Sequence, residues 1–251
     1  MNERSDTLRP ADLRAAGVSR AFAGLVALDD VTLQVARHEI VGLIGPNGAG
    51  KTTLVNIITG FDTPDTGTVT LEGTEITGWR PDRLGRLGLA RTFQGSHSFS
   101  GLTTRENIEV AALGSGATPK EARQRADRLM PMLGLSDLET APAGALPHGH
   151  ERKLGVARAL GTDPKFLLMD EPAAGLDQSE IDGFAKVIED VRDTHDVGVL
   201  LIDHNITLIM SICDRIHVLG EGKTLAVGDP AEVRADPKVA TAYRGLIEKA
   251  G

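Results

Sequence analysis

The chain has few of the residues that build disulfide frameworks, membrane spans or secretory signals. Its 251 residues include a single cysteine, Cys213, which excludes an intrachain disulfide and is typical of a reducing compartment. No apolar run approaches the ~18 residues needed to cross a bilayer. The first residues, 1–10, lack the continuous apolar core of a secretory signal. We therefore expect a cytosolic protein whose membrane association, if any, comes from a partner.

Aromatic residues are also scarce, at 3% of the chain, and the formal net charge is −8. An acidic balance without a series of stacking aromatics argues against a nucleic-acid surface, so we expect no nucleic-acid partner. Hydrophobic residues nevertheless reach 41%, which means that aliphatic side chains must do most of the packing. This composition suits a parallel sheet covered by helices, and the length is sufficient for one large α/β domain.

The strongest chemical signal is a complete GxxxxGK[ST] pattern after an apolar run at 39–44. The pattern and the residue after it comprise Gly45, Pro46, Asn47, Gly48, Ala49, Gly50, Lys51, Thr52 and Thr53. Its glycines let successive N–H groups face one anion, and a helix beginning near Lys51 adds its positive end. We expect Lys51 to reach the β- and γ-phosphates of a nucleotide and the Thr52 hydroxyl to bind Mg²⁺.

A second signal is a run of four apolar residues, 166–169, that ends in Asp170 and Glu171. Taken alone, the run also fits a strand followed by a solvated acidic turn. Beside a phosphate loop, a buried strand that ends in paired carboxylates indicates a catalytic edge. We expect Asp170 to support the Mg²⁺ bound by Thr52, and Glu171 to polarise the attacking water.

The order of patterns predicts an α/β core with a helical insertion. Residues 1–15 are expected to form a polar leader, and 16–251 a single domain that contains a helical subdomain at 98–158. Strand patterns occur at 28–35, 39–44, 68–71, 166–169 and 197–202, and helical spacing occurs at 105–113, 120–133, 151–160 and 179–194. The alternation of strand and helix in the last third predicts parallel βαβ units.

In this order, the motifs resemble the ATP-binding subunit of an ABC transporter. In that family 45–52 is the Walker A motif and 166–171 is the Walker B motif. The resemblance assigns four further residues: the Q-loop Gln94, which helps bind Mg²⁺ and water, the D-loop Asp177, the switch histidine His204, which contacts the γ-phosphate, and the A-loop aromatic Phe22, which stacks on adenine. Taken separately, Phe22 also fits a core position, Gln94 a surface amide and His204 a helix cap.

Segments 41–54, 58–61, 88–94 and 229–237 resemble the G-type ATPase of branched-chain amino-acid importers. Such importers combine two related ATPases, two membrane permeases and an external solute-binding protein. The resemblance implies Mg²⁺-dependent ATP hydrolysis on a P-loop NTPase fold, with a RecA-like core, an antiparallel β layer and the inserted helices. It also implies a cytoplasmic protein that is peripheral on the inner face of the cell membrane. A heterodimer of ATPases is expected, a homodimer stays open, and the solute stays open between branched-chain amino acids and other small polar solutes.

The signature motif departs from the family pattern. Where Leu-Ser-Gly-Gly-Gln is usual, this chain has Leu146, Pro147, His148, Gly149 and His150. In the family's head-to-tail dimer this motif contacts ATP held by the other subunit, but Pro147 has neither a hydroxyl nor an N–H. It does suit the first turn of a helix, whose N-terminus could still favour an anion.

This non-consensus signature, with proline after leucine, resembles variants seen in the branched-chain branch of the family. We therefore expect the motif to remain functional. The two composite ATP sites would then be unequal if the partner carries a standard signature. His148 and His150 also suggest a metal site, but no third ligand accompanies them, so solvated positions fit these two histidines better.

Several residues and two whole functions stay open. Phe99 and Leu102 follow Gln94 where the family receives the permeases' coupling helices, although either could be subdomain core. The arginines at 80, 83, 86 and 91 are expected on a solvated helix face. The alternatives are a soluble, non-transport ABC ATPase and a lipopolysaccharide-export ATPase. Members of the first usually carry two cassettes, large insertions or zinc-type cysteine sets, and the second normally keeps a standard signature.

Overall fold

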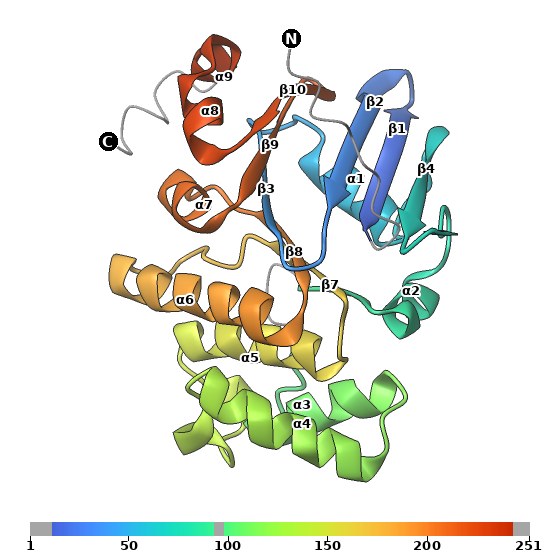
Figure 1. Cartoon of the computed structure of the whole chain (residues 1–251). Coiled ribbons are helices and arrows are strands. Elements are labelled where there is room, and N and C mark those ends of the chain that lie inside the picture. The colour runs from blue at the N-terminus through green and yellow to red at the C-terminus, as the bar shows by residue number, and fades with distance from the viewer. Residues whose placement is uncertain (1–11, 93–97, 243–251) are drawn as a thin grey trace.

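The computed structural model describes residues 12–92 and 98–242, which form two sheets and a set of helices beneath them (Figure 1). In the described part, one sheet has the strand order β2-β1-β4-β5 and the other β10-β9-β3-β8-β7-β6. The strands of the first are β1 Leu13–Phe22, β2 Leu25–Val35, β4 Thr66–Leu71 and β5 Thr74–Glu75. Those of the second are β3 Ile40–Ile44, β6 Leu89–Arg91, β7 Phe166–Asp170, β8 Gly198–Ile202, β9 Arg215–Gly220 and β10 Lys223–Gly228.

The larger sheet is parallel except at its β10 edge. Every residue of β3 and β8 is buried, as is expected of parallel strands that are covered on both faces. Along β7, Phe166 and Leu168 pack in one core cluster, and Leu167 and Met169 pack in the other. The predicted parallel strands are therefore confirmed, and the carboxyl ends of β3, β7 and β8 meet at one edge of the sheet.

The smaller sheet is antiparallel and corrects the expected leader. β1 begins at Leu13, so the leader predicted at 1–15 overlaps a strand at its end. Leu13 and Ala15 are fully buried and lie opposite Val35 and Leu33 of β2, contacts that hold this segment in the sheet. Residues 1–11 lie outside the described part of the chain.

Helices join and cover the two sheets. Around the sheets lie α1 Lys51–Ile58, α2 Pro81–Leu87, α6 Gln178–His195, α7 Ile206–Ile212, α8 Pro230–Ala235 and α9 Pro237–Ala242. Below them in Figure 1 are α3 Thr104–Gly114, α4 Pro119–Met132 and α5 His148–Gly161, with short 3-10 helices at Ser136–Leu138 and Ala143–Ala145. The four predicted helical stretches are confirmed, and α5, predicted at 151–160, extends from His148 to Gly161. None of the described helices combines the length and the apolar composition that a bilayer span needs.

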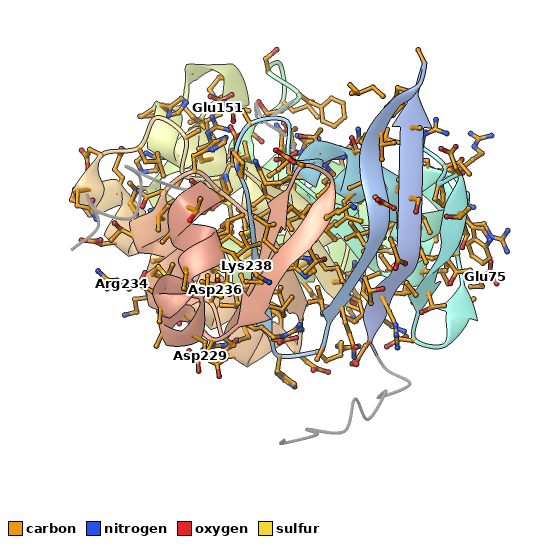
Figure 2. The ribbon with its side chains drawn as sticks, turned by 90° about the horizontal axis from the view of Figure 1, so that it is seen from above. Glu75, Glu151, Asp229, Arg234, Asp236 and Lys238 are labelled. Atoms are coloured by element: carbon orange, nitrogen blue, oxygen red, sulfur yellow. The ribbon has the colours of Figure 1, made fainter. Side chains whose placement is uncertain are left out.

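Local sequence explains where several helices begin. Thr103 and Glu106 form a capping box at α3, and Thr118 and Glu121 form another at α4, where Pro119 opens the first turn. Figure 2 shows Asp229, Arg234, Asp236 and Lys238 around α8 and α9, and Glu75 of β5 at the opposite side of the molecule.

Candidate active site

The loop between β3 and α1 needs glycine at two points. Gly50 has φ 101° and is the N-cap of α1, and a Cβ there would lie 2.6 Å from the Ala27 carbonyl oxygen. A Cβ at Gly45 would lie 2.4 Å from the Leu219 carbonyl oxygen. Because neither position has room for a side chain, glycine lets the loop backbone pass close to the carbonyls of β2 and β9. The predicted strand, turn and helix are confirmed.

Lys51 is the first residue of α1, and its side chain bonds back to the loop. Its Nζ donates to the carbonyl oxygens of Gly45 at 2.6 Å and Pro46 at 3.1 Å. Burial lowers the pKa of the ammonium, while Glu171 and Asp170 act in the opposite direction. The lysine is therefore a cation that is partly removed from water and faces the two acids.

A cleft of about 590 Å³ opens over the loop. It brings together most of the nucleotide-binding and catalytic residues predicted from the sequence. Its lining includes Asn47, Gly48, Ala49, Gly50, Lys51, Thr52, Thr53, Asp170, Glu171 and His204. Segments far apart in the chain meet here because the strands that carry them are parallel and end at the same edge.

Glu171 and His204 make direct contact, with 2.7 Å between Oε1 and Nε2. Glu171 adopts a left-handed backbone, φ 49°, and its N–H donates to the Ile202 carbonyl oxygen at 2.7 Å. That conformation is costly for a residue with a side chain, by about 1 kcal/mol, so the surrounding contacts must hold it in place.

Asp203 shapes the turn that carries His204, a role that the sequence did not reveal. Its carboxylate accepts from the N–H groups of Ala173 at 3.0 Å and Asn205 at 2.8 Å, and it is only 6% exposed. Burial raises the pKa of Asp203, and the two N–H groups oppose that shift. The sequence feature that could have indicated this role is an acid directly after the apolar strand at 197–202.

Arg91 corrects a prediction. It lies on β6 and not on a solvated helix face, its side chain is 10% exposed, and it donates to Oδ2 of Asp170 at 2.8 Å. The reason is strand pairing: β6 is parallel to β7 with Arg91 opposite Leu168, so Arg91 reaches the same edge as Asp170. The arginines at 80, 83 and 86 are exposed on or beside α2.

The signature residues and the D-loop lie against each other. Pro147 is the N-cap of α5, and the His148 ring lies 3.1 Å from where a Cβ of Gly175 would stand. Gly149 likewise faces the Glu180 carboxylate. Asp177 caps α6 by accepting from the Glu180 N–H at 2.9 Å. The described residues that line the cleft include neither motif.

The aromatic residue expected at adenine lies apart from the cleft lining. Phe22 is 44% exposed, and its ring lies 4.8 Å from Cζ of Arg20. The cleft wall near it is made instead by Leu25 and Val26, which are 75% and 55% exposed. The sequence analysis did not identify this pair. The feature that could have indicated it is two adjacent apolar residues at the start of a half-exposed strand.

Of the remaining predicted residues, Gln94 lies outside the described part of the chain. Phe99 is 49% exposed and its ring lies 5.1 Å from Cζ of Arg158, while Leu102 is half-buried. Within 12–92 and 98–242, no group of three or more His, Cys, Asp or Glu side chains is placed to hold a metal by itself. Thr52 and Asp170 line one cleft with oxygen donors, which fits Mg²⁺ because it takes one or two protein oxygens together with phosphates and water.

Comparison with known proteins agrees with this geometry. The family model described as ABC transporter matches residues 28–174, and that of the branched-chain amino acid ATP-binding cassette transporter matches 223–243. The chain is 39% identical over 248 residues to the high-affinity branched-chain amino acid transport ATP-binding protein BraF of Pseudomonas aeruginosa, covering 93% of this chain and 97% of that protein. It is 39% identical over 244 residues to LivG of Escherichia coli K12, covering 91% and 96%. The lipopolysaccharide export protein LptB of Haemophilus influenzae is 35% identical over 234 residues, covering 93% and 97%.

Solved structures agree as well. A nucleotide-free ATP-binding cassette from an ABC transporter superposes with a TM-score of 0.83 at 30% identity, covering 92% of this chain and 98% of that one. An ADP conformation of such a cassette also gives 0.83 at 30% identity, covering 93% and 98%. The predicted P-loop cassette fold is confirmed. The chain belongs to the ABC transporter family, as an ATP-hydrolysing subunit of the branched-chain amino-acid type.

Proposed function

We propose that this chain powers uptake of branched-chain amino acids, or of related small polar solutes, by Mg²⁺-dependent ATP hydrolysis coupled to membrane permeases. The observation that carries the chemistry is the 2.7 Å contact between Glu171 and His204 in the phosphate-loop cleft. The solute class is supported by the match of 223–243 to the branched-chain family model and by the names of the relatives.

Each group in the cleft has a role in hydrolysis. Lys51 and the loop N–H groups bind the β- and γ-phosphates and stabilise charge in the transition state, helped by the positive end of α1. Glu171 accepts the proton of the attacking water, and His204 orients that water and the γ-phosphate. Thr52 and Asp170, with Gln94, would hold Mg²⁺, which when bound neutralises phosphate charge.

The cleft is completed by a second ATPase subunit. This chain's signature residues, 146–150, and its Asp177 are not among the described residues that line its own cleft. They would therefore serve ATP held by the other subunit, in a head-to-tail pair that closes on binding and reopens after hydrolysis. We propose a heterodimer, two transmembrane permeases that are contacted near Phe99 and Leu102, and an external solute-binding protein. The subunit would lie in the cytoplasm against the inner face of the membrane.

Purification of the intact complex tests the transport proposal. The tagged chain is recovered from its native cells in mild detergent, and co-purifying proteins are identified by mass spectrometry. Two multi-span permeases and a second single-cassette ATPase are expected. Recovery of soluble partners only, under conditions that preserve other transporter complexes, would overturn the transport role. Uptake of labelled leucine, with urea as the comparison solute, then tests the solute class in cells that carry the wild-type chain or Glu171→Gln.

The heterodimer predicts unequal ATP sites. If the partner carries a standard signature, the site built on this chain's phosphate loop and Glu171 would be the more active. Its opposing signature comes from the partner, whereas the other site uses this chain's non-consensus residues 146–150. Glu171→Gln should then lower ATP turnover of the complex more than the equivalent change in the partner. Equal losses would remove the asymmetry.

A further inference from the structure

The guanidinium of Arg91 joins the end of β7 to the last turn of α1. Its Nη2 donates to Oδ2 of Asp170 at 2.8 Å, and its Nη1 donates to Oδ1 of Asn56 at 2.8 Å and to Oγ1 of Thr59 at 3.3 Å. The Thr59 hydroxyl donates in turn to the Val55 carbonyl oxygen at 2.6 Å. Arg91 is thus fixed by the helix that follows the phosphate loop.

Arg91 and Asp170 face different cavities. Asp170 lines the nucleotide cleft together with Thr52. Arg91 lines a separate cavity of about 470 Å³, which is bounded by residues of α2, β6, α3 and α5. The arginine therefore contacts the carboxylate from outside the nucleotide cleft, and its bond to Oδ2 leaves Oδ1 free of that contact.

The negative charge around Asp170 favours a cationic partner such as Arg91. Asp170 is 15% exposed, it directly precedes Glu171, and Asp203 directly follows the neighbouring strand β8. Neighbouring carboxylates repel one another, and a poorly solvated carboxylate costs free energy unless a cation or hydrogen-bond donors face it. A charge-assisted bond from a planar guanidinium supplies both and also fixes the direction of the carboxylate.

We propose that Arg91 is a positioning residue that holds Asp170 in the orientation needed for the divalent cation of the bound nucleotide. This inference rests on the proposed Mg²⁺-dependent function. Removal of a group that hydrogen-bonds to a metal ligand and orients it typically lowers metal affinity by about 10–100-fold. Loss of Arg91 should therefore weaken cation binding and leave the phosphate loop's hold on metal-free nucleotide unchanged.

The test measures metal affinity directly. Mn²⁺ is titrated into protein with a non-hydrolysable ATP analogue, and free Mn²⁺ is read by electron paramagnetic resonance. Arg91→Gln should bind Mn²⁺ about 10-fold more weakly than wild type. Arg91→Lys should fall between them, because a point charge cannot hold Asp170 and Asn56 together. Affinity for a fluorescent ATP analogue in EDTA should be the same in all three. Arg83→Gln, an exposed arginine on α2 that stacks over Trp79, is the matched control.

A double-mutant cycle separates positioning from general structure. If Arg91 acts through Asp170, Arg91→Gln should cause no further loss of Mn²⁺ affinity in an Asp170→Asn background. Equal Mn²⁺ affinity of wild type and Arg91→Gln, or additive losses in the cycle, would overturn the inference. If Arg91→Gln does not fold, the same cycle with Arg91→Lys decides. Failure of the wild-type protein to bind Mn²⁺ with the nucleotide would instead refute the proposed metal-dependent function, upon which the inference stands.

Discussion

Glu171 and His204 follow two neighbouring parallel strands and still meet, with Oε1 and Nε2 2.7 Å apart. The pairing register explains the contact, because Asp170 lies opposite Ile202 and each reactive residue lies just beyond that pair. The Glu171 N–H bond to the Ile202 carbonyl and the Asp203 bonds to Ala173 and Asn205 fix both turns. The contact between the proposed general base and its histidine is thus held by one backbone hydrogen bond and by the Asp203 carboxylate.

Replacing Glu171 should abolish turnover without abolishing nucleotide binding. Glu171→Gln keeps the shape of the side chain but removes the base, so kcat should fall by about 10²–10⁴-fold. His204→Ala should act in the same direction, and the two changes together should cost little more than either alone. Single-turnover ATP hydrolysis and binding of a fluorescent ATP analogue check both parts. Glu75→Gln, the same change on β5 at the far side in Figure 2, is the control, and a similar loss there would contradict a specific role for Glu171.

Two Gly→Ala changes, one in the phosphate loop and one in α2, should have opposite effects on stability. At Gly45, a Cβ would meet the Leu219 carbonyl oxygen at 2.4 Å, so Gly45→Ala should lower the free energy of unfolding by about 1–3 kcal/mol and weaken ATP binding. At Gly85, inside α2, no heavy atom lies within 4 Å of the added Cβ, and Gly85→Ala should stabilise by about 0.5–1 kcal/mol. Thermal unfolding compares the two, and equal melting temperatures would show that the Gly45 contact is not restrictive.

Local patterns explain which parts of this fold were predictable. The strands β3 and β8 are apolar throughout, and β7 is apolar up to Asp170. The loop after β3 has glycine where the backbone needs it, so sequence alone located the phosphate loop and both acids. The position of Arg91 could not be read in this way, because it depends on a short strand, β6, pairing with β7. Likewise, the start of β1 is weakly patterned as a strand and is fixed by β2 and β4. Gln94 stays a prediction, since it lies outside the described residues.

The cleft wall makes a prediction about the adenine base. Leu25 lines the cleft, while Phe22 stands beside Arg20 outside the lining. Leu25→Ser should weaken ATP binding about fivefold, for a loss of roughly 1 kcal/mol of apolar contact. Phe22→Ala should cost about 1–3 kcal/mol if the ring stacks on the base. Affinities for ATP and for inorganic triphosphate, which has no base, are compared.

Both changes should spare triphosphate binding. Val227→Ser, an exposed apolar residue on β10 outside the cleft lining, is the matched control for Leu25→Ser. A loss confined to Phe22→Ala would assign the base to the aromatic ring alone, and unchanged ATP affinity in both variants would place the base elsewhere.

A buried histidine on β9 should make stability depend on pH. His217 is 1% exposed, and its Nε2 lies 2.9 Å from the Thr224 hydroxyl. Burial lowers the pKa of His217 from 6.5 to about 4, and Arg215 acts in the same direction. Between these values the unfolded chain binds a proton that the folded chain does not, so the free energy of unfolding falls as the pH falls. By pH 4 the loss from this group should be roughly 3 kcal/mol.

Chemical denaturation at pH 7.5 and 4.5 measures this dependence. His217→Gln, which cannot titrate, should be less stable than wild type at pH 7.5 but should lose less stability on acidification. Thr224→Val keeps the imidazole and should keep the wild-type dependence. Because other acids titrate equally in the three proteins, the difference between their curves isolates His217. Parallel curves for wild type and His217→Gln would mean that this histidine is protonated as easily in the folded chain as in the unfolded one.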